Sequence, residues 1–104
     1  MRSMVYINLL KEEVENNGKL NLTIHGNSML PLIKCGDILT VIKCHQYKIG
    51  DIVAYHSNEI KDYNIIVHRV IFVRKTYVLT KGDNNDFIDP IKVKIENIIG
   101  KIIT

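Results

Sequence analysis

A serine, a histidine and a group of carboxylates are the side chains of this sequence that suit bond-breaking chemistry. Ser28 follows an apolar stretch that ends at Gly26, and Pro31 stops that stretch from continuing as a strand. A serine at such a corner presents its hydroxyl and has free backbone N–H groups beside it, as an oxyanion requires. This setting favours Ser28 as a nucleophile, although a serine beside a glycine is far more often a turn residue or a cap.

A serine hydroxyl attacks only when a base within hydrogen-bond reach removes its proton. His68 is the best candidate, because it forms a polar pair with Arg69 inside the otherwise apolar run Ile65–Ile71. A charge buried there without a partner would be unfavourable. The alternative is a pair on the water-facing side of a sheet. The other histidines lack metal-site spacing, and we expect structural or exposed positions for all three: His25, His45 and His56.

The segment Lys81–Pro90 carries three carboxylates, including Asp83 and Asp89, in a polar stretch beside a glycine. A carboxylate of this kind can orient an imidazole and stabilise its protonated form. The alternatives are a surface turn or a calcium loop, and the ligand spacing of an EF-hand is not met. Cys35 and Cys44 form no CxxC pair, so neither a disulfide framework nor a zinc site is indicated. We expect no metal and no cofactor.

Hydrophobic periodicity indicates the elements that position these residues. Apolar residues three and four apart predict an amphipathic helix over Met4–Asn17, capped by Gly18; they are Met4, Val5, Ile7, Leu10 and Val14. Alternation of apolar and polar residues from Leu20 to His25 predicts a half-buried strand. Further strands are expected at Ile38–Lys43, Asp51–His56, Ile65–Val73, Tyr77–Thr80 and Ile98–Ile103. Ser57–Asn64 and Lys81–Pro90 are predicted loops.

The organisation of the chain indicates one small domain. It has 104 residues, with no linker, low-complexity tract or charge block that would divide it. We therefore predict a single peptidase-like domain over residues 1–104, with a helix in residues 1–18 and a β domain in residues 20–104. The fold class is α+β, mostly β, with an antiparallel sheet and the N-terminal amphipathic helix packed on its edge or face.

Charge and hydropathy exclude several classes of function. Fourteen Lys and Arg and eleven Asp and Glu give a net charge of +3 without a basic stripe, so we expect no nucleic-acid partner. The apolar runs are too short for a transmembrane segment. The N-terminus becomes polar too early for a secretory signal, so we expect a cytoplasmic location. Peripheral association of the short helix with a membrane surface stays open, and the sequence does not indicate an oligomeric state.

Five short segments, taken in order, resemble the boxes of the signal peptidase I superfamily. They are Gly26–Pro31, Gly36–Asp37, Gly50–Val53, His68–Val70 and Gly82–Asn85. The resemblance extends over roughly Leu22 to Thr104. It implies a coiled, mostly antiparallel β domain of the signal-peptidase and SOS-repressor type, in which Ser28 attacks a peptide carbonyl. Bacterial-type members use a lysine as the base, whereas endoplasmic-reticulum and archaeal members have a histidine, so the resemblance implies a Ser-His mechanism through His68.

The resemblance also implies roles for the surrounding residues. Asp83 and Asp89 both match acidic positions of relatives, and we favour Asp89 for the third catalytic role and Asp83 for structure. Some relatives carry a hydroxyl two residues before the nucleophile, where this chain has Gly26, so backbone N–H groups must bind the oxyanion. The substrate-binding and oxyanion residues are then Gly26, Asn27 and Met29, and the residues of the structural turns are Gly50, Asp51, Arg69 and Gly82.

The expected function is cleavage of an extended peptide that adds as a strand beside Asn21–Asn27 and the His68 strand. Compact bacterial relatives without a membrane anchor imply removal of a leader peptide in the cytoplasm. One alternative is a repressor-type self-processing domain. No DNA-binding domain precedes Ser28, and His68 stands where such a domain needs a lysine; both features oppose it. The other alternative is a noncatalytic module that holds a peptide in the same groove.

Overall fold

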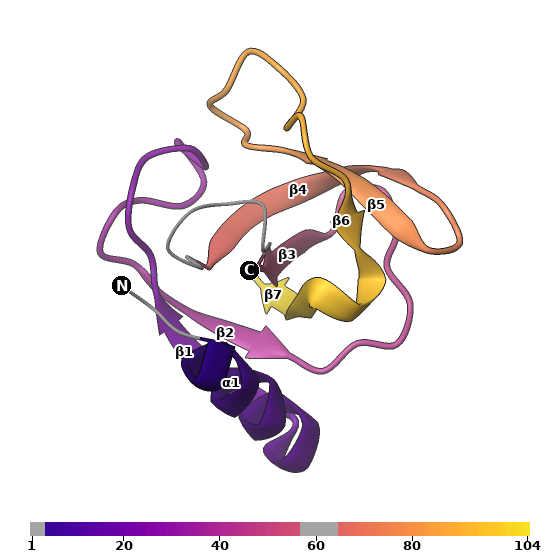
Figure 1. Ribbon diagram of the computed structural model, residues 1–104. Coiled ribbons are helices and arrows are strands. Elements are labelled where there is room, and N and C mark those ends of the chain that lie inside the picture. The colour runs from indigo at the N-terminus through magenta and orange to yellow at the C-terminus, as the bar shows by residue number, and fades with distance from the viewer. Residues whose placement is uncertain (1–3, 57–64) are drawn as a thin grey trace.

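The computed structural model describes residues 4–56 and 65–104, so the predicted loop Ser57–Asn64 lies outside the described residues. One helix is followed by seven strands, with a 3₁₀ turn at Ile95–Asn97 (Figure 1). The elements are α1 (Met4–Asn17), β1 (Lys19–Thr23), β2 (Ile38–Ile42), β3 (Ile52–Tyr55), β4 (Ile66–Val73), β5 (Tyr77–Lys81), β6 (Val93–Lys94) and β7 (Ile98–Ile103).

The strands form one sheet in the order β1-β2-β7-β3-β4-β5-β6, and each neighbouring pair is antiparallel. Register shifts after Ala54 and Val70 bend the strands, because a bulge increases the local twist. All four residues of β3 are buried, since the coiled sheet has a core cluster on each of its faces. The predicted fold, a coiled antiparallel sheet with one helix, is confirmed.

The strand β7 joins the two halves of the sheet. It pairs with β2 through Thr40–Ile42 on one side and with β3 through Val53–Tyr55 on the other. Gly100 allows this close packing, because a Cβ there would lie 2.4 Å from the Ile42 carbonyl oxygen. The β1–β2 hairpin, which leads to Ser28, and the β3–β6 half, which carries His68, therefore meet through β7.

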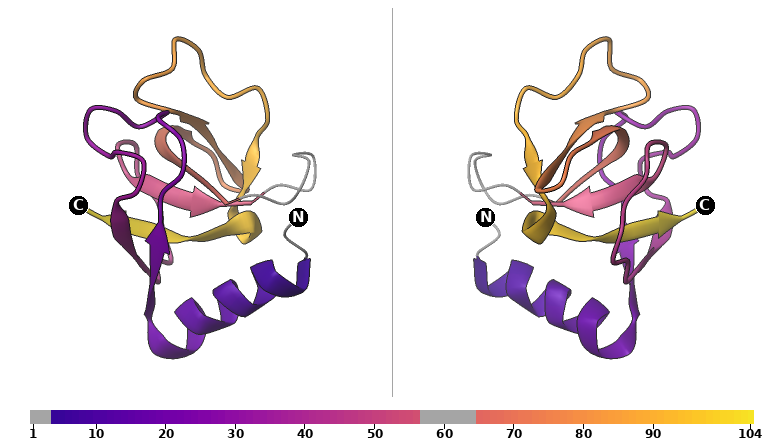
Figure 2. Two further views of the ribbon diagram at one scale, coloured as in Figure 1. Left: turned by 90° about the vertical axis from the view of Figure 1, so that its left-hand side faces the viewer. Right: turned by 90° about the vertical axis from the view of Figure 1, so that its right-hand side faces the viewer.

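The helix α1 lies below the sheet, against β1 and β7 (Figure 2). Ile7 and Val14 are buried on its inner face, and Leu10 is half-buried there. Val5 was predicted on the same stripe but is 69 % exposed. At 3.6 residues per turn Val5 lies on the opposite side from Ile7. No helix among residues 4–56 and 65–104 is long and apolar enough to cross a membrane.

Two strand predictions need correction. The first strand ends at Thr23 rather than His25. The Ile24 N–H still donates to the Asp37 carbonyl in the β1–β2 register, but the Ile24 carbonyl accepts from the Gly36 N–H, one residue out of register, so regular pairing stops there. The two-residue strand β6 and the 3₁₀ turn were not predicted, since an element of two or three residues has no detectable period.

Candidate active site

Ser28 lies in the turn that follows β1. Gly26 has φ +89, a left-handed conformation that glycine adopts without strain, and it redirects the chain away from the strand. The Leu30 N–H then donates to the Asn27 carbonyl at 3.2 Å, and the Ile33 N–H donates to the Met29 carbonyl at 3.0 Å. The Ser28 backbone N–H has no hydrogen-bond partner among the described residues. The turn thus presents both a hydroxyl and a free donor.

His68 lies in the middle of the sheet, on β4, directly opposite Val53 of β3. Because side chains alternate along a strand, His68 points to the same face as Val70, and its ring meets the Tyr55 ring edge-on with centroids 6.4 Å apart. The residue is 9 % exposed. A buried position on a rigid strand fixes the orientation of the imidazole.

The His68 ring connects Ser28 to Asp89. His68 Nε2 lies 3.0 Å from Ser28 Oγ, and His68 Nδ1 lies 2.5 Å from Asp89 Oδ2. An ionised carboxylate only accepts hydrogen bonds, so Nδ1 carries the ring proton and donates a hydrogen bond to Asp89. Nε2 is then the acceptor that faces the serine hydroxyl. The arrangement has the geometry by which an imidazole can take a proton from a hydroxyl.

Asp89 is held by three further contacts. Thr80 Oγ1 donates to Asp89 Oδ2 at 2.7 Å, Tyr55 OH donates to the same oxygen at 3.3 Å, and the Asp89 N–H donates to the Thr80 carbonyl at 2.9 Å. Burial raises the pKa of Asp89, but the hydrogen bonds from His68 and Thr80 outweigh this effect and hold the pKa below its ordinary value. Asp89 therefore stays ionised beside the imidazole.

Tyr55 and Thr80 are site residues that the sequence prediction missed. Thr80 is fully buried, and Tyr55 is 3 % exposed. Burial raises the pKa of the Tyr55 phenol, so it remains a donor. The sequence signal that could have indicated them is the alternation of side chains along a strand. Thr80 lies two residues after Val78, and Tyr55 two residues after Val53, so each shares the inward face with a buried valine. A polar group at such a position must have a buried partner.

The structure places Asp83 against Arg69 and not against His68. Arg69 Nε and Nη2 donate to the two carboxylate oxygens at 2.9 and 2.8 Å, and Nη1 donates to the Gly50 carbonyl at 2.8 Å. Hydrogen bonding to Arg69 lowers the pKa of Asp83, and the same bonds raise the pKa of Arg69. This bidentate pair ties the loop after β5 to the turn before β3.

The turn before β3 is shaped by its own side chain. Asp51 Oδ2 accepts a hydrogen bond from the Lys48 N–H at 2.8 Å, the Asp51 N–H donates to the Lys48 carbonyl, and Lys101 Nζ lies 3.2 Å from Asp51 Oδ1. The Gly50 N–H donates to the Val70 carbonyl. Gly50 and Asp51 thus lie in the turn that precedes β3.

Gly82 lies where the turn that carries Ser28 meets the loop after β5. A Cβ at this position would lie 2.8 Å from the Ser28 carbonyl oxygen and 3.0 Å from Ser28 Cβ, so no other residue fits without displacement. The Asn84 N–H donates to the Ser28 carbonyl at 2.8 Å, and Asn84 Nδ2 donates to the Asn27 carbonyl at 3.1 Å. Segments that are distant in sequence therefore hold Ser28 in place.

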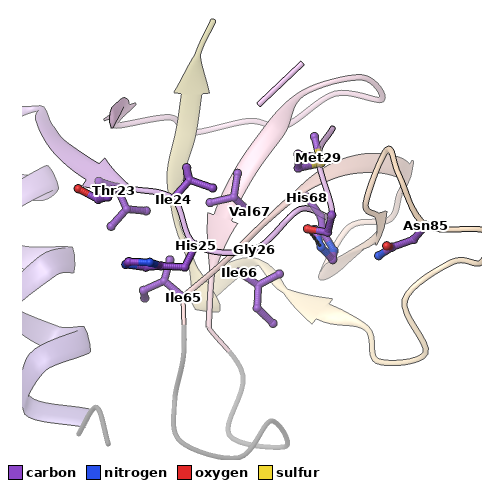
Figure 3. Close-up of a pocket in the computed structure, with 12 residues that line it drawn as sticks. Thr23, Ile24, His25, Gly26, Met29, Ile65, Ile66, Val67, His68 and Asn85 are labelled. Carbon is purple, nitrogen blue, oxygen red and sulfur yellow. Dashed lines mark hydrogen bonds between the residues drawn. The ribbon is translucent and has the colours of Figure 1, made fainter. Parts of the chain in front are cut away.

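A groove of about 510 Å³ leads to these residues (Figure 3). Leu22–Gly26 forms one wall and Ile65–Val67 the other, while Ser28, Met29, His68 and Asn85 complete the lining. Of the predicted substrate-binding residues, Gly26 and Met29 line the groove. Met29 is also buried in the core. Asn27 is not among the residues that line the groove, and its carbonyl accepts hydrogen bonds from Asn84 and Leu30.

The remaining polar candidates lie elsewhere. His25 is on the groove wall, His45 is exposed, and His56 is 2 % exposed at the end of β3. Within residues 4–56 and 65–104, no three His, Cys, Asp or Glu side chains gather in a way that could hold a metal ion.

Comparisons with known proteins agree with this architecture. The sequence profile of the Peptidase S24-like family matches residues 3–103. The chain is also similar to the signal peptidase complex catalytic subunit SEC11 of the fungus Clavispora lusitaniae, with 41% identity over 78 residues. That match covers 69% of this chain and 45% of the relative, so the chain spans about half the length of the relative. No solved structure matched.

The relative is fungal, so the comparison gives no support to a special similarity with the compact bacterial relatives. The profile match extends over almost the whole chain, and the fold has the coiled antiparallel sheet predicted from the five boxes. The chain belongs to the Peptidase S24-like family, within the superfamily of signal peptidase I.

Proposed function

We propose that this chain is a serine endopeptidase of the signal-peptidase type, with Ser28 as nucleophile, His68 as general base and Asp89 as the residue that orients His68. The observation that carries the proposal is the His68 ring, whose Nε2 lies 3.0 Å from Ser28 Oγ while Nδ1 contacts Asp89. The family and the similarity to a signal peptidase catalytic subunit support the same class of reaction.

In the first step, His68 Nε2 takes the Ser28 hydroxyl proton while Ser28 Oγ bonds to the carbonyl carbon of the substrate. Asp89 stabilises the imidazolium that forms. The free Ser28 N–H is the donor available to the oxyanion, in keeping with Gly26 having no side chain to contribute. The C–N bond then breaks, and His68 gives the proton to the leaving amine.

In the second step, the acyl group remains on Ser28 Oγ until a water molecule attacks it. His68 takes the proton of that water, the ester bond breaks, and the proton returns to Ser28 Oγ. The acyl half of the peptide leaves as a carboxylic acid. His68 Nε2 is thus the proton acceptor at the start of both steps.

The substrate binds as an extended strand in the groove. Among the described residues, no strand pairs with the outer edge of β1, and β5 pairs with β4 only from Arg69 onward. Leu22–Gly26 and Ile65–Val67 therefore border the groove with free backbone edges. Main-chain pairing sets the register of a peptide in such a site. A leader or signal segment with small residues before the cut, as in relatives, is the substrate class we assign.

The proposal is tested with a fluorophosphonate probe and with peptide libraries read by mass spectrometry. We expect wild type and Thr76→Ala, which removes an exposed hydroxyl outside the groove, to be labelled and to cleave peptides, whereas Ser28→Ala does neither. Peptide binding without any product in wild type would contradict the proposal and favour a noncatalytic module. Fragments formed from the protein alone would favour a self-processing domain.

A further inference from the structure

Asn85 is a groove residue to which neither the sequence nor the mechanism assigns a function. It lies in the loop between β5 and β6, is exposed, and lines the groove beside Ser28. A Cβ placed on Gly82 would lie 2.6 Å from Asn85 Nδ2 and 3.0 Å from Ser28 Cβ. The amide and the nucleophile side chain thus border the same small space.

The two neighbouring asparagines of this loop differ in their contacts. Asn84 uses its amide on the Asn27 carbonyl and its N–H on the Ser28 carbonyl, so it stabilises the turn. The Asn85 N–H closes a turn onto the Gly82 carbonyl at 2.9 Å, but the Asn85 side chain has no hydrogen-bond partner among the described residues. Its donor and acceptor are free to contact a ligand.

The position of Asn85 along the groove distinguishes it from the other lining residues. In Figure 3, His68 lies between Asn85 on one side and Gly26, Ile66 and Val67 on the other. The walls on the Gly26 side are largely apolar and have free strand edges. Asn85 is the polar side chain that continues the groove beyond the reacting groups.

Peptide hydrolysis makes different demands on the two sides of the groove, the Gly26 side and the Asn85 side. The acyl half must stay bound until water attacks, so it suits the largely apolar side that offers backbone pairing. The leaving half must depart after the first step, so a weaker contact at an exposed polar group suits it. A side-chain amide can match one peptide unit, with Nδ2 donating to a carbonyl and Oδ1 accepting from an N–H.

We propose that Asn85 binds the backbone of the substrate segment that follows the scissile bond. The inference rests on the proposed function and adds a substrate requirement to it. Efficient substrates are polypeptides with residues beyond the cut, and the contact is to their main chain rather than to a particular side chain. Asn85 then aligns the leaving amine toward His68, which must protonate it.

The test compares two substrates with the same acyl half, an N-acetylated peptide ending in Ala-Leu-Ala. In one this half is followed by several residues, and in the other by a para-nitrophenyl ester that has no peptide unit to bind. Loss of one neutral hydrogen bond corresponds to about a three- to tenfold effect. We expect Asn85→Ala and the isosteric Asn85→Asp to lower the peptide-to-ester ratio of kcat/KM by about that factor.

Asn84→Ala is the matched control. It removes the side-chain hydrogen bond to the Asn27 carbonyl and keeps the backbone bond to Ser28, so it weakens the turn that carries Ser28, slows both substrates together and leaves the ratio unchanged. A second readout is transfer of the acyl group from Ser28 to added glycinamide, which must bind on the leaving side. Asn85→Ala lowers the share of acyl groups that go to this amine rather than to water.

An unchanged ratio and an unchanged partition to glycinamide in Asn85→Ala would overturn the inference, and so would an equal loss on both substrates. These results leave Ser28-dependent ester hydrolysis in the wild type intact, so the proposed function survives them. If the wild type turns over neither substrate, the proposed function fails and the inference fails with it.

Discussion

Two buried histidines, one on β4 and one directly after the neighbouring β3, show what distinguishes a candidate site from a packed side chain. His68 on β4 is 9 % exposed, and both of its ring nitrogens have partners. His56 directly after β3 is 2 % exposed, and neither ring nitrogen has a partner among the described residues. Burial alone therefore does not identify a base. The difference lies in an acceptor on one side of the ring and a hydroxyl on the other.

The largest effect expected from this difference is on turnover. His68→Ala removes the proton acceptor and lowers kcat by about ten-thousandfold or more. His56→Gln and the exposed control His45→Ala retain activity, because neither ring contacts the groove. Steady-state kinetics on the three variants, with circular dichroism to confirm folding, make the comparison. An equal loss of activity in His56→Gln and His68→Ala would contradict the distinction between the two histidines.

The second effect is on the orientation of the His68 ring. Asp89→Asn replaces an acceptor by an amide that can donate to Nδ1, which forces the proton onto Nε2, where the base must be free. We expect kcat to fall by about a hundred- to ten-thousandfold. Asp86→Asn, an exposed change in the same loop, serves as the control. Equal kinetics in the two variants would show that Asp89 does not orient the base.

The third effect is on stability rather than on chemistry. Arg69 lowers the pKa of Asp83 in the folded chain. The stabilisation from this pair is therefore fully present above the unfolded carboxyl pKa of about 3.9, and it is lost as pH falls through the lower pKa of the folded chain. Asp83→Asn should lower the free energy of unfolding by about 1 kcal/mol at neutral pH. Urea unfolding across the acid range tests this, and an unchanged pH dependence would contradict it.

The smallest effect concerns His56 and its response to acid. Burial, and then the charge of Lys11, lower the pKa of His56. Below about pH 6.5, His56 is protonated in the unfolded chain while it is still neutral in the folded chain. The free energy of unfolding therefore decreases as pH falls below this value. His56→Gln should reduce the pH dependence of the unfolding midpoint between about pH 7 and pH 5. A slope that matches the wild type would mean that His56 is not held neutral.

Much of the fold was predictable because its long elements have a clear period. The bounds of α1 and β7 agree with the expected ranges, and β2 and β4 agree within one residue. Val5 was misplaced because three- and four-residue steps describe two overlapping stripes on one short helix. The strand β6 has two residues and forms only because β5 offers it an edge. Such an element depends on tertiary contacts that no local pattern contains.

The residues of the candidate site also fall into two groups, those that the sequence predicted and those that depend on tertiary contacts. Ser28, His68 and Asp89 were predicted as a set, and the structure brings them together. Tyr55 and Thr80 could not be assigned to Asp89 from sequence, since β3 and β5 both flank β4 only after the sheet has formed. His56 was expected at a structural or an exposed position, and the sequence could not decide between the two because the end of β3 is covered by a segment distant in sequence.

The central position of β7 also bears on when the candidate site is assembled during synthesis of the chain. A ribosome completes Ser28, then His68 and then Asp89, before it makes the strand that joins the β1–β2 hairpin to the β3–β6 half. The nascent chain thus holds all three groups without the scaffold that aligns them. Because β7 pairs with β2 on one side and with β3 on the other, these three side chains are aligned only after β7 has left the ribosome.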